Sequence, residues 1–123
     1  MATKILVVED NESIRTIVRT ALEMDEYEVI EADNGMKGLQ ILKRNPDCAL
    51  VITDLAMPVM DGYELLARIR GDMRLRSLPV FVLTAEKDAT AALDKGATRL
   101  IRKPFSPIEL LESVRRALRP PTP

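Results

Sequence analysis

Short apolar segments typical of buried β-strands alternate along this chain with segments of helical periodicity. The strand-like segments begin at Ile5, Glu28, Ala49, Val80 and Thr98, and the intervals between them carry apolar residues at helical spacing. Parallel strands need a crossover connection, which is usually a helix. The alternation therefore predicts an α/β fold, in which helices cover both faces of a five-stranded parallel sheet.

The composition of the five segments predicts their order in the sheet. The segments that begin at Ile5, Leu50 and Val80 are apolar on both faces, which is typical of central strands covered on both sides. Charged residues within Glu28–Ala32 and Thr98–Arg102 favour the two edges. With right-handed crossovers, these constraints predict a doubly wound sheet in the order 2-1-3-4-5.

Capping residues indicate where several helices begin. Asn34 is a candidate N-cap of the second helix. The segment from Ser106 to Glu109 combines an N-cap, a proline in the first turn and a capping-box glutamate. The helical spacing predicts inward-facing residues on these two helices: Met36, Leu39 and Leu42, and then Ile108, Leu111, Val114 and Leu118.

Composition excludes several kinds of chemistry. The chain has no histidine, which rules out Ser/His/Asp and Cys/His catalysis and histidine-ligated zinc. A formal net charge of −1 gives no support for general binding to nucleic acid or membrane surfaces. Cys48 is the only cysteine, so no internal disulfide forms, and we expect a small buried thiol in a cytoplasmic protein. No apolar run approaches the roughly 20 residues of a membrane span.

Chemically active residues follow four of the predicted strands. Glu9 and Asp10 follow the first, Asp54 ends the third, Thr84 follows the fourth and Lys103 follows the fifth. Taken singly, each has an ordinary interpretation, as a turn acid, a strand terminus or a solvated lysine. In a parallel sheet, however, the carboxyl ends of the strands meet at one edge, where such folds bind ligands. The sequence therefore predicts one cleft that holds three carboxylates, a hydroxyl and an ammonium.

This set of groups suits phosphoryl transfer. Clustered carboxylates repel one another unless a cation is present, which favours a divalent metal with oxygen ligands such as Mg²⁺. We expect Asp54 to be the nucleophile, Glu9 and Asp10 to anchor the metal, and Lys103 to bind the phosphoryl oxygens. Thr84 would donate a hydrogen bond to the new phosphoryl group.

Five short motifs contain or adjoin these residues: Val-Val-Glu-Asp at 7–10, the segment from Asp54 to Gly62, Thr84-Ala85, Gly96-Ala97 and Lys103-Pro104-Phe105. Together they resemble the motifs of the response-regulator receiver domain of two-component signalling. The resemblance implies a flavodoxin-like sheet, Mg²⁺, and phosphate transfer to Asp54 from a phosphohistidine on a sensor kinase or phosphotransfer protein. It also implies an acyl phosphate that hydrolyses itself, so that the chain is a signalling switch rather than an enzyme acting on other substrates.

The resemblance assigns further roles around the site. The backbone carbonyl of Ala56 is expected to complete the metal shell, and the peptide bond between Lys103 and Pro104 is a candidate for the cis form. The family often has an aromatic switch residue three positions before the lysine. This chain has Leu100 there, and we expect it to form a fixed part of a docking face. The segment from Thr84 to Gly96 is about one turn shorter than in the chemotaxis-type regulator, which predicts a short fourth helix.

The expected partners are proteins. Residues 1–119 are predicted to form the receiver domain and residues 120–123 a proline-rich tail, without a DNA-binding or catalytic output module. Arg115, Arg116 and Arg119 are expected to complement the negative end of the last helix rather than bind nucleic acid. A kinase or phosphotransfer protein is expected to dock near Ile14 and Ile17; the alternative is that both are core residues.

Three other interpretations stay open at this point. In the first, the chain is the receiver piece of a larger response regulator or hybrid histidine kinase. An aspartyl-phosphate hydrolase also uses an aspartate at a strand end, but it usually has a second acid at the position of Ala56. A flavodoxin-type cofactor binder shares the fold, but Glu9, Asp10 and Glu12 would repel the phosphate of its ligand.

Overall fold

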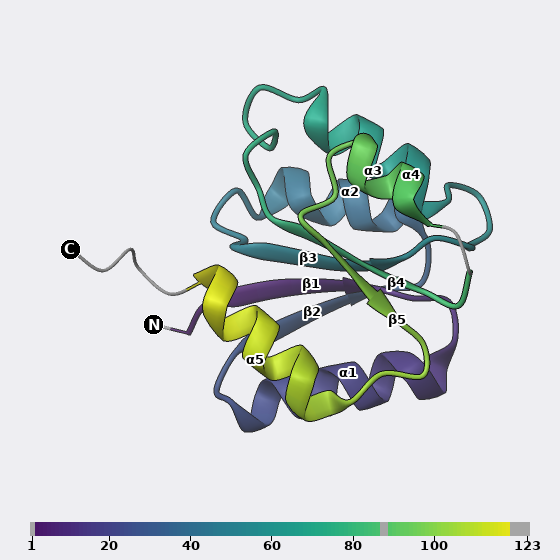
Figure 1. The fold of residues 1–123 in the computed structure, drawn as a ribbon. Coiled ribbons are helices and arrows are strands. Elements are labelled where there is room, and N and C mark those ends of the chain that lie inside the picture. The colour runs from purple at the N-terminus through teal and green to yellow at the C-terminus, as the bar shows by residue number, and fades with distance from the viewer. Residues whose placement is uncertain (1, 87–88, 119–123) are drawn as a thin grey trace.

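The structure is a computed structural model that describes residues 2–86 and 89–118. Strands and helices alternate along these residues, as predicted (Figure 1). The elements are β1 (Lys4–Val8), α1 (Glu12–Met24), β2 (Glu28–Ala32), α2 (Gly35–Arg44), β3 (Leu50–Asp54), α3 (Gly62–Arg70), β4 (Val80–Thr84), α4 (Thr90–Asp94), β5 (Arg99–Arg102) and α5 (Pro107–Leu118). The predicted tail and Arg119 lie outside the described residues.

All paired strands are parallel, in the order β2-β1-β3-β4-β5. The predicted fold class and strand order are therefore confirmed. The register places Val8 beside Thr53 and Asp54 beside Leu83, so the carboxyl ends of the three central strands lie at one edge of the sheet. This edge is where the sequence places the candidate site.

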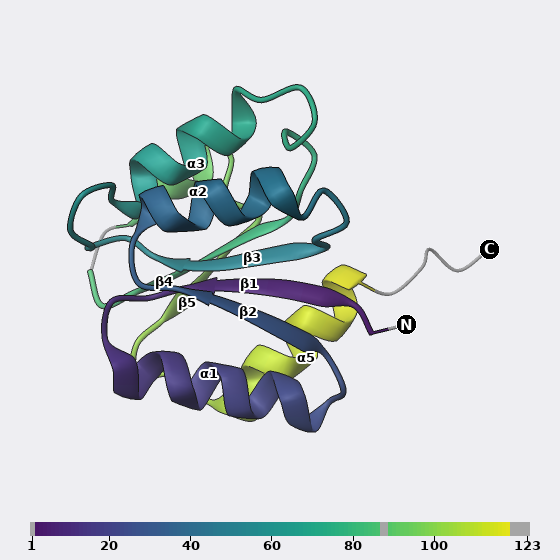
Figure 2. The same ribbon diagram turned by 180° about the vertical axis from the view of Figure 1, so that it is seen from behind.

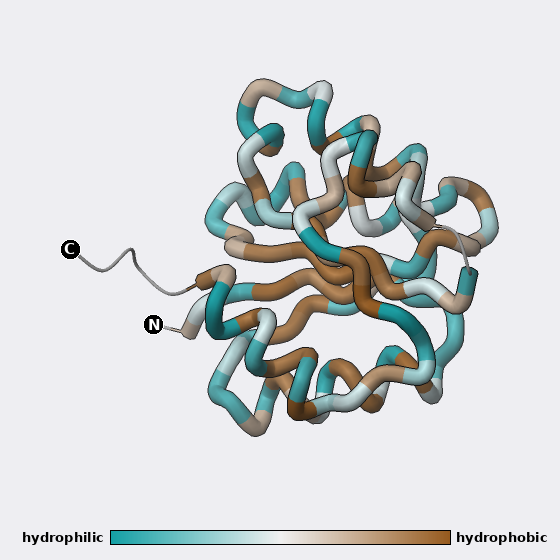
Figure 3. Tube along the Cα trace, in the orientation of Figure 1, coloured by the Kyte–Doolittle hydropathy of each residue, from teal (hydrophilic) through white to brown (hydrophobic). Residues whose placement is uncertain are grey.

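Helices cover both faces of the sheet. Figures 1 and 2 show α2, α3 and α4 on one face and α1 and α5 on the other. Because successive residues of a strand face opposite sides, Leu6 and Val8 pack into the first apolar cluster and Ile5 and Val7 into the second. The sheet at the centre of the molecule is accordingly its most hydrophobic layer (Figure 3).

Side-chain caps begin the helices near the expected residues. The side chains of Asn11, Asn34 and Asp61 each accept a hydrogen bond from the backbone N–H three residues later. Ser106 Oγ accepts one from the Glu109 N–H at 3.3 Å. Helix α4 has five residues, and Gly96, with a φ of 107°, follows it closely. The prediction of a short fourth helix is confirmed.

Two predicted inward positions are wrong. Ile108 is 70% exposed, whereas Leu110 and Val114 of the same helix are buried. At 100° per residue, Ile108 lies roughly 120° around the helix from Val114, while Leu110 lies within about 40° of it. Met36 is 39% exposed, because the buried face of α2 is built around the glycines at 35 and 38 together with Leu39 and Leu42.

The burial of Cys48, Ile14 and Ile17 tests two further expectations from the sequence. Cys48 is buried, as predicted, and its thiol lies 3.4 Å from the backbone oxygen of Leu50. Ile14 is half-buried, but Ile17 is 49% exposed, so the interpretation of both as core residues is wrong for Ile17.

Within residues 2–86 and 89–118, no helix is both long and apolar enough to cross a membrane.

Candidate functional site

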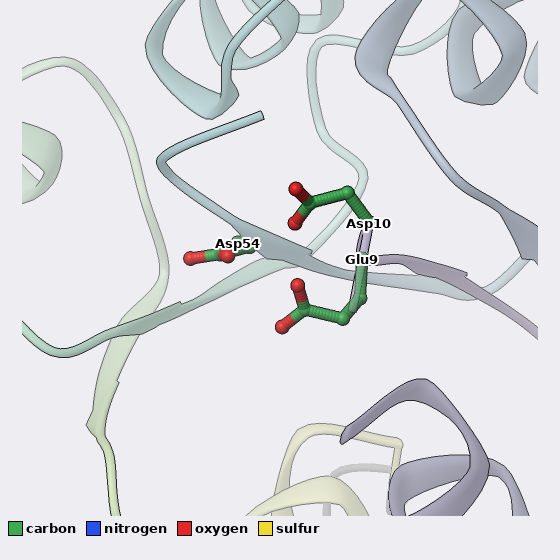
Figure 4. A group of neighbouring side chains, drawn as sticks. All are labelled: Glu9, Asp10 and Asp54. Atoms are coloured by element: carbon green, nitrogen blue, oxygen red, sulfur yellow. The ribbon is translucent and has the colours of Figure 1, made fainter. Parts of the chain in front are cut away.

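Three carboxylates meet where β1 and β3 end. Glu9 and Asp10 directly follow β1, and Asp54 is the last residue of β3. One oxygen atom from each of the three side chains lies within 4.8 Å of the others. Figure 4 shows the three carboxylates gathered around a common space at the sheet edge. The predicted grouping of these acids is therefore found in the structure.

Lys103 joins this acidic group. Its Nζ atom lies 2.9 Å from Glu9 Oε1 and 3.2 Å from Asp54 Oδ2. The Lys103 backbone N–H donates to the carbonyl oxygen of Thr84 at 2.8 Å, which continues the pairing of β4 with β5. The peptide bond between Lys103 and Pro104 is cis, as the resemblance implied. The sheet thus brings a residue that follows its edge strand into contact with the central acids.

Glu9 is fully buried, and hydrogen bonds hold it on several sides. Its backbone N–H donates to the Ala32 carbonyl at 3.0 Å. Its carboxylate accepts from Lys103 through Oε1 and from the Asn11 N–H through Oε2, the latter at 3.2 Å. Asn11 in turn caps α1 with its side chain. The start of α1 therefore helps to orient the first acid of the site.

Burial disfavours the charged forms of Glu9 and Lys103, whereas the hydrogen bond between them favours the charged forms. Burial raises the pKa of Glu9 to about 7, and the nearby charge of Asp54 acts in the same direction, against the hydrogen bonds from Lys103 and the Asn11 N–H. Burial alone would lower the pKa of Lys103. The hydrogen bonds and negative charges of Glu9 and Asp54 outweigh that effect and raise its pKa instead. Lys103 therefore stays protonated at neutral pH.

Asp54 is buried at the start of a loop that folds back on itself. Its Oδ1 atom accepts a hydrogen bond from the Leu55 N–H at 2.8 Å. The Gly62 N–H donates to the Leu55 carbonyl at 2.8 Å, which places the start of α3 directly against the end of β3. A Cβ atom on Gly62 would lie only 2.2 Å from the Asp54 carbonyl oxygen, so this approach requires glycine.

The remaining predicted residues lie around this centre. Thr84 is buried at the end of β4, next to β3, and its Oγ1 accepts from the Glu86 N–H at 3.0 Å. Ala56 lies in the exposed loop after Asp54. Leu100 is half-buried on β5 and packs against the apolar cluster on the side of α2, α3 and α4. The individual roles assigned to these three residues stay predictions.

The donor set fits a hard divalent cation. Three carboxylates and one ammonium leave the site with an excess of negative charge, and carboxylate oxygens are the usual protein ligands of Mg²⁺. Across residues 2–86 and 89–118, Glu9, Asp10 and Asp54 form the one group of three such side chains close enough to share an ion. These residues could therefore hold the predicted metal.

Sequence reasoning did not single out Arg15. Its Nη1 atom donates to the backbone oxygen of Glu9 at 2.8 Å, and its Nε atom contacts Glu31 Oε1 at 3.1 Å. An arginine in the first turns of a helix has an ordinary interpretation as a solvated residue. The one signal in the sequence is its place four residues after the N-cap Asn11, which turns it back toward the strand end.

Comparisons with known proteins agree with this geometry. The sequence model described as "Response regulator receiver domain" matches residues 5–115 of the chain. The chain is 36% identical over 115 residues to the chemotaxis protein CheY1 of Helicobacter pylori, and the match covers 90% of this chain and 93% of that protein.

Solved structures have the same fold. The chemotaxis response regulator CheY4 of Vibrio cholerae superimposes with a TM-score of 0.89 at 32% identity, covering 96% of this chain and 100% of that one. The receiver domain of the sensor histidine kinase PA1611 of Pseudomonas aeruginosa has a TM-score of 0.87 at 28% identity, covering 94% of this chain and 97% of that one. A magnesium ion is coordinated in the active-site cleft of that receiver domain.

Proposed function

The chain belongs to the response regulator receiver domain family of two-component signalling, and on this premise we propose that Asp54 is its phosphoacceptor. The phosphoryl group would come from a phosphohistidine on a sensor histidine kinase or a histidine phosphotransfer protein. The signal would then pass by protein contact to a downstream protein, in the cytoplasm. The observation that carries this proposal is the position of Lys103 Nζ, which lies 3.2 Å from Asp54 Oδ2 and 2.9 Å from Glu9 Oε1.

Transfer to Asp54 forms one bond to phosphorus and breaks one. An Asp54 carboxylate oxygen attacks the phosphorus, the P–N bond to the donor imidazole breaks, and the imidazole leaves with the bonding electron pair and takes up a proton. The side chain changes from a charge of −1 to about −2. Lys103 compensates this added charge, and its present contact with Asp54 means that little reorganisation is needed.

Glu9, Asp10 and Asp54 would hold the Mg²⁺, and by resemblance the backbone carbonyl of Ala56 would complete its shell. When bound, the metal supplies charge neutralisation and orientation for the phosphoryl oxygens. The magnesium reported in the cleft of the PA1611 receiver domain supports this assignment. So does the spacing of the three carboxylates, whose oxygens lie within 4.8 Å of one another.

The phosphorylated state would end by attack of water on the phosphorus, which releases phosphate and restores the Asp54 carboxylate. This self-hydrolysis is the only further reaction proposed for the chain. Thr84 would donate its hydroxyl hydrogen to a phosphoryl oxygen, because the hydrogen bond from Glu86 uses Thr84 Oγ1 as an acceptor. Leu100, at the position of the family's aromatic switch residue, would keep its packing against the apolar cluster in both states.

The proposal is tested by incubation with acetyl phosphate and Mg²⁺, followed by intact mass measurement. We expect wild-type protein to gain one phosphoryl group that hydroxylamine removes, since hydroxylamine cleaves acyl phosphates. Asp54→Asn should gain none. Asp94→Asn, a change at an exposed aspartate on α4, is the matched control and should gain the group as wild type does. Full phosphorylation of Asp54→Asn, or of wild type with EDTA in place of Mg²⁺, would contradict the proposal.

A further inference from the structure

We propose that Arg15 is a positioning residue of the acidic site, which orients the peptide between Glu9 and Asp10 and thereby strengthens Mg²⁺ binding. The inference rests on the proposed function, because it takes that site as a Mg²⁺ site. Arg15 does not contact the carboxylates themselves. Its hydrogen bond goes to the backbone oxygen of Glu9, at 2.8 Å.

The hydrogen bond from Arg15 holds the peptide group that joins Glu9 to Asp10. The carbonyl of Glu9 and the N–H of Asp10 belong to one planar peptide group. Fixing the direction of the carbonyl therefore fixes the plane that joins the two acids. The other side of Glu9 is held by the sheet, since its N–H donates to the Ala32 carbonyl. With both backbone groups of Glu9 engaged, the turn after β1 has little rotational freedom.

Arg15 is itself held by a contact with β2. Its Nε contacts Glu31 Oε1 on β2 at 3.1 Å, and its side chain is only 18% exposed. The other oxygen of Glu31 contacts Arg19 Nη1 at 3.0 Å. A guanidinium is planar and donates in fixed directions, so contacts with a side chain of β2 and a carbonyl beyond β1 restrict its orientation. Arg15 thus connects the edge strand β2 to the backbone of the site.

The positive charge of Arg15 and its positioning role have different consequences for Mg²⁺ binding. Arg15 carries a positive charge, so by charge alone it would weaken the binding of a divalent cation, and its removal would strengthen binding. If Arg15 acts by orienting the peptide, its removal weakens binding instead. The two explanations predict opposite signs, which makes the neutral variant Arg15→Gln decisive. Arg19→Gln is the matched control, because it removes an equal charge from the same Glu31 without any contact to Glu9.

The experiment is calorimetric titration of Mg²⁺ into metal-free wild type, Arg15→Gln, Arg15→Lys and Arg19→Gln. We expect Arg15→Gln to weaken Mg²⁺ binding by roughly tenfold, the lower end of the effect seen when groups that orient metal ligands are removed. Arg15→Lys, which keeps the charge but loses the planar guanidinium, should also bind more weakly than wild type. Arg19→Gln should stay within about twofold of wild type, since it leaves the contact with Glu9 intact.

A second readout needs no metal. In ¹H–¹⁵N spectra of the metal-free proteins, the Asp10 amide signal should move in both Arg15 variants and stay in place in Arg19→Gln. Wild-type or tighter Mg²⁺ affinity in the Arg15 variants would overturn the inference. If Arg15→Gln does not fold, Arg15→Lys decides by the same criterion. Absence of Mg²⁺ binding by wild type would instead overturn the proposed function, so the two failures are distinguishable.

Discussion

Glu9 is a buried carboxyl group, and its protonation determines how the metal-free site responds to pH. Its pKa in the folded protein is raised to about 7 from 4.5. Between these two values the folded state binds more protons than the unfolded state, so this residue makes stability fall as pH rises from about 4.5 to about 7. Below this window Glu9 is uncharged in both states, and above it the folded protein contains a buried charge.

We therefore predict that Glu9→Gln stabilises the metal-free protein relative to wild type more at pH 8 than at pH 5, by about 1 kcal/mol or more. The glutamine stays neutral, whereas Glu9 ionises over this interval. Urea unfolding in EDTA at the two pH values measures the difference. Glu112→Gln, at an exposed position on α5, serves as the control and should show no such change. An equal effect of Glu9→Gln at both pH values would contradict the assigned pKa.

The sequence predicts the acidic residues and the lysine of the site better than it predicts the neighbouring residues that orient them. Because Glu9, Asp54 and Lys103 each lie where a predicted strand ends, strand topology alone brings them together. Arg15 could not be found in this way, since its role depends on the orientation of α1 against β2. The raised pKa of Glu9 likewise depends on how completely neighbouring elements cover the strand end, which a strand pattern does not specify.

At the scale of secondary-structure elements, the contact between β3 and α3 depends on Gly62. We predict that Gly62→Ala destabilises the protein by about 2 kcal/mol or more, because the added Cβ would overlap backbone atoms that cannot move aside. The nearest of these are the Asp54 carbonyl oxygen at 2.2 Å and the Leu55 Cα at 2.8 Å. Urea unfolding measures the loss.

Gly71→Ala is the matched control for this prediction. Gly71 ends α3 with a φ of −84°, and its nearest neighbour to an added Cβ is the Ala67 oxygen at 3.2 Å. We expect a change within about 1 kcal/mol at this position. Wild-type stability of Gly62→Ala would show that the start of α3 can shift away from Asp54.

The elements themselves were predictable because two periodicities alternate clearly along the chain. The length of α4 followed from the short interval before Gly96. The buried face of α2 could not be predicted in this way, because Gly35 and Gly38 let the helix approach Met60 and Val8 closely. A pattern of apolar side chains does not reveal a face that is built around glycines. Ile108 was misplaced for a related reason: the capping segment predicts where α5 begins, but not how the helix is rotated against the sheet.

At the scale of the whole molecule, an ion pair connects the last helix to the end of the first. Arg115 of α5 contacts both carboxylate oxygens of Asp25, at 2.8 Å each. Asp25 is the C-cap of α1, where the helix dipole disfavours a negative charge. The hydrogen bond and charge of Arg115 hold the pKa of Asp25 below its usual value of 3.8. Arg115 lies in the last turn of α5, as the sequence predicts, and it also complements the end of α1.

We predict that Arg115→Gln lowers the melting temperature slightly at pH 7 and by less at pH 2. A carboxyl group whose pKa is lower in the folded state stabilises the fold at any pH above its pKa in the unfolded state. This contribution is lost as the pH falls through its pKa in the folded state. The effect should be small, because the pair lies near solvent. Arg116→Gln, at a neighbouring exposed residue, is the control. An equal loss at both pH values would indicate that packing, not charge, links the two helices.

Among residues 2–86 and 89–118, the sheet also divides the buried apolar side chains into two compartments with no member in common. Leu6 and Val8 belong to one compartment, and Ile5 and Val7 to the other. A chimaera could therefore take α1 and α5 from a relative, together with the strand residues that face them, without repacking the opposite compartment. Specificity for an upstream partner and for a downstream one could be exchanged separately wherever their docking surfaces lie on different sides of this partition.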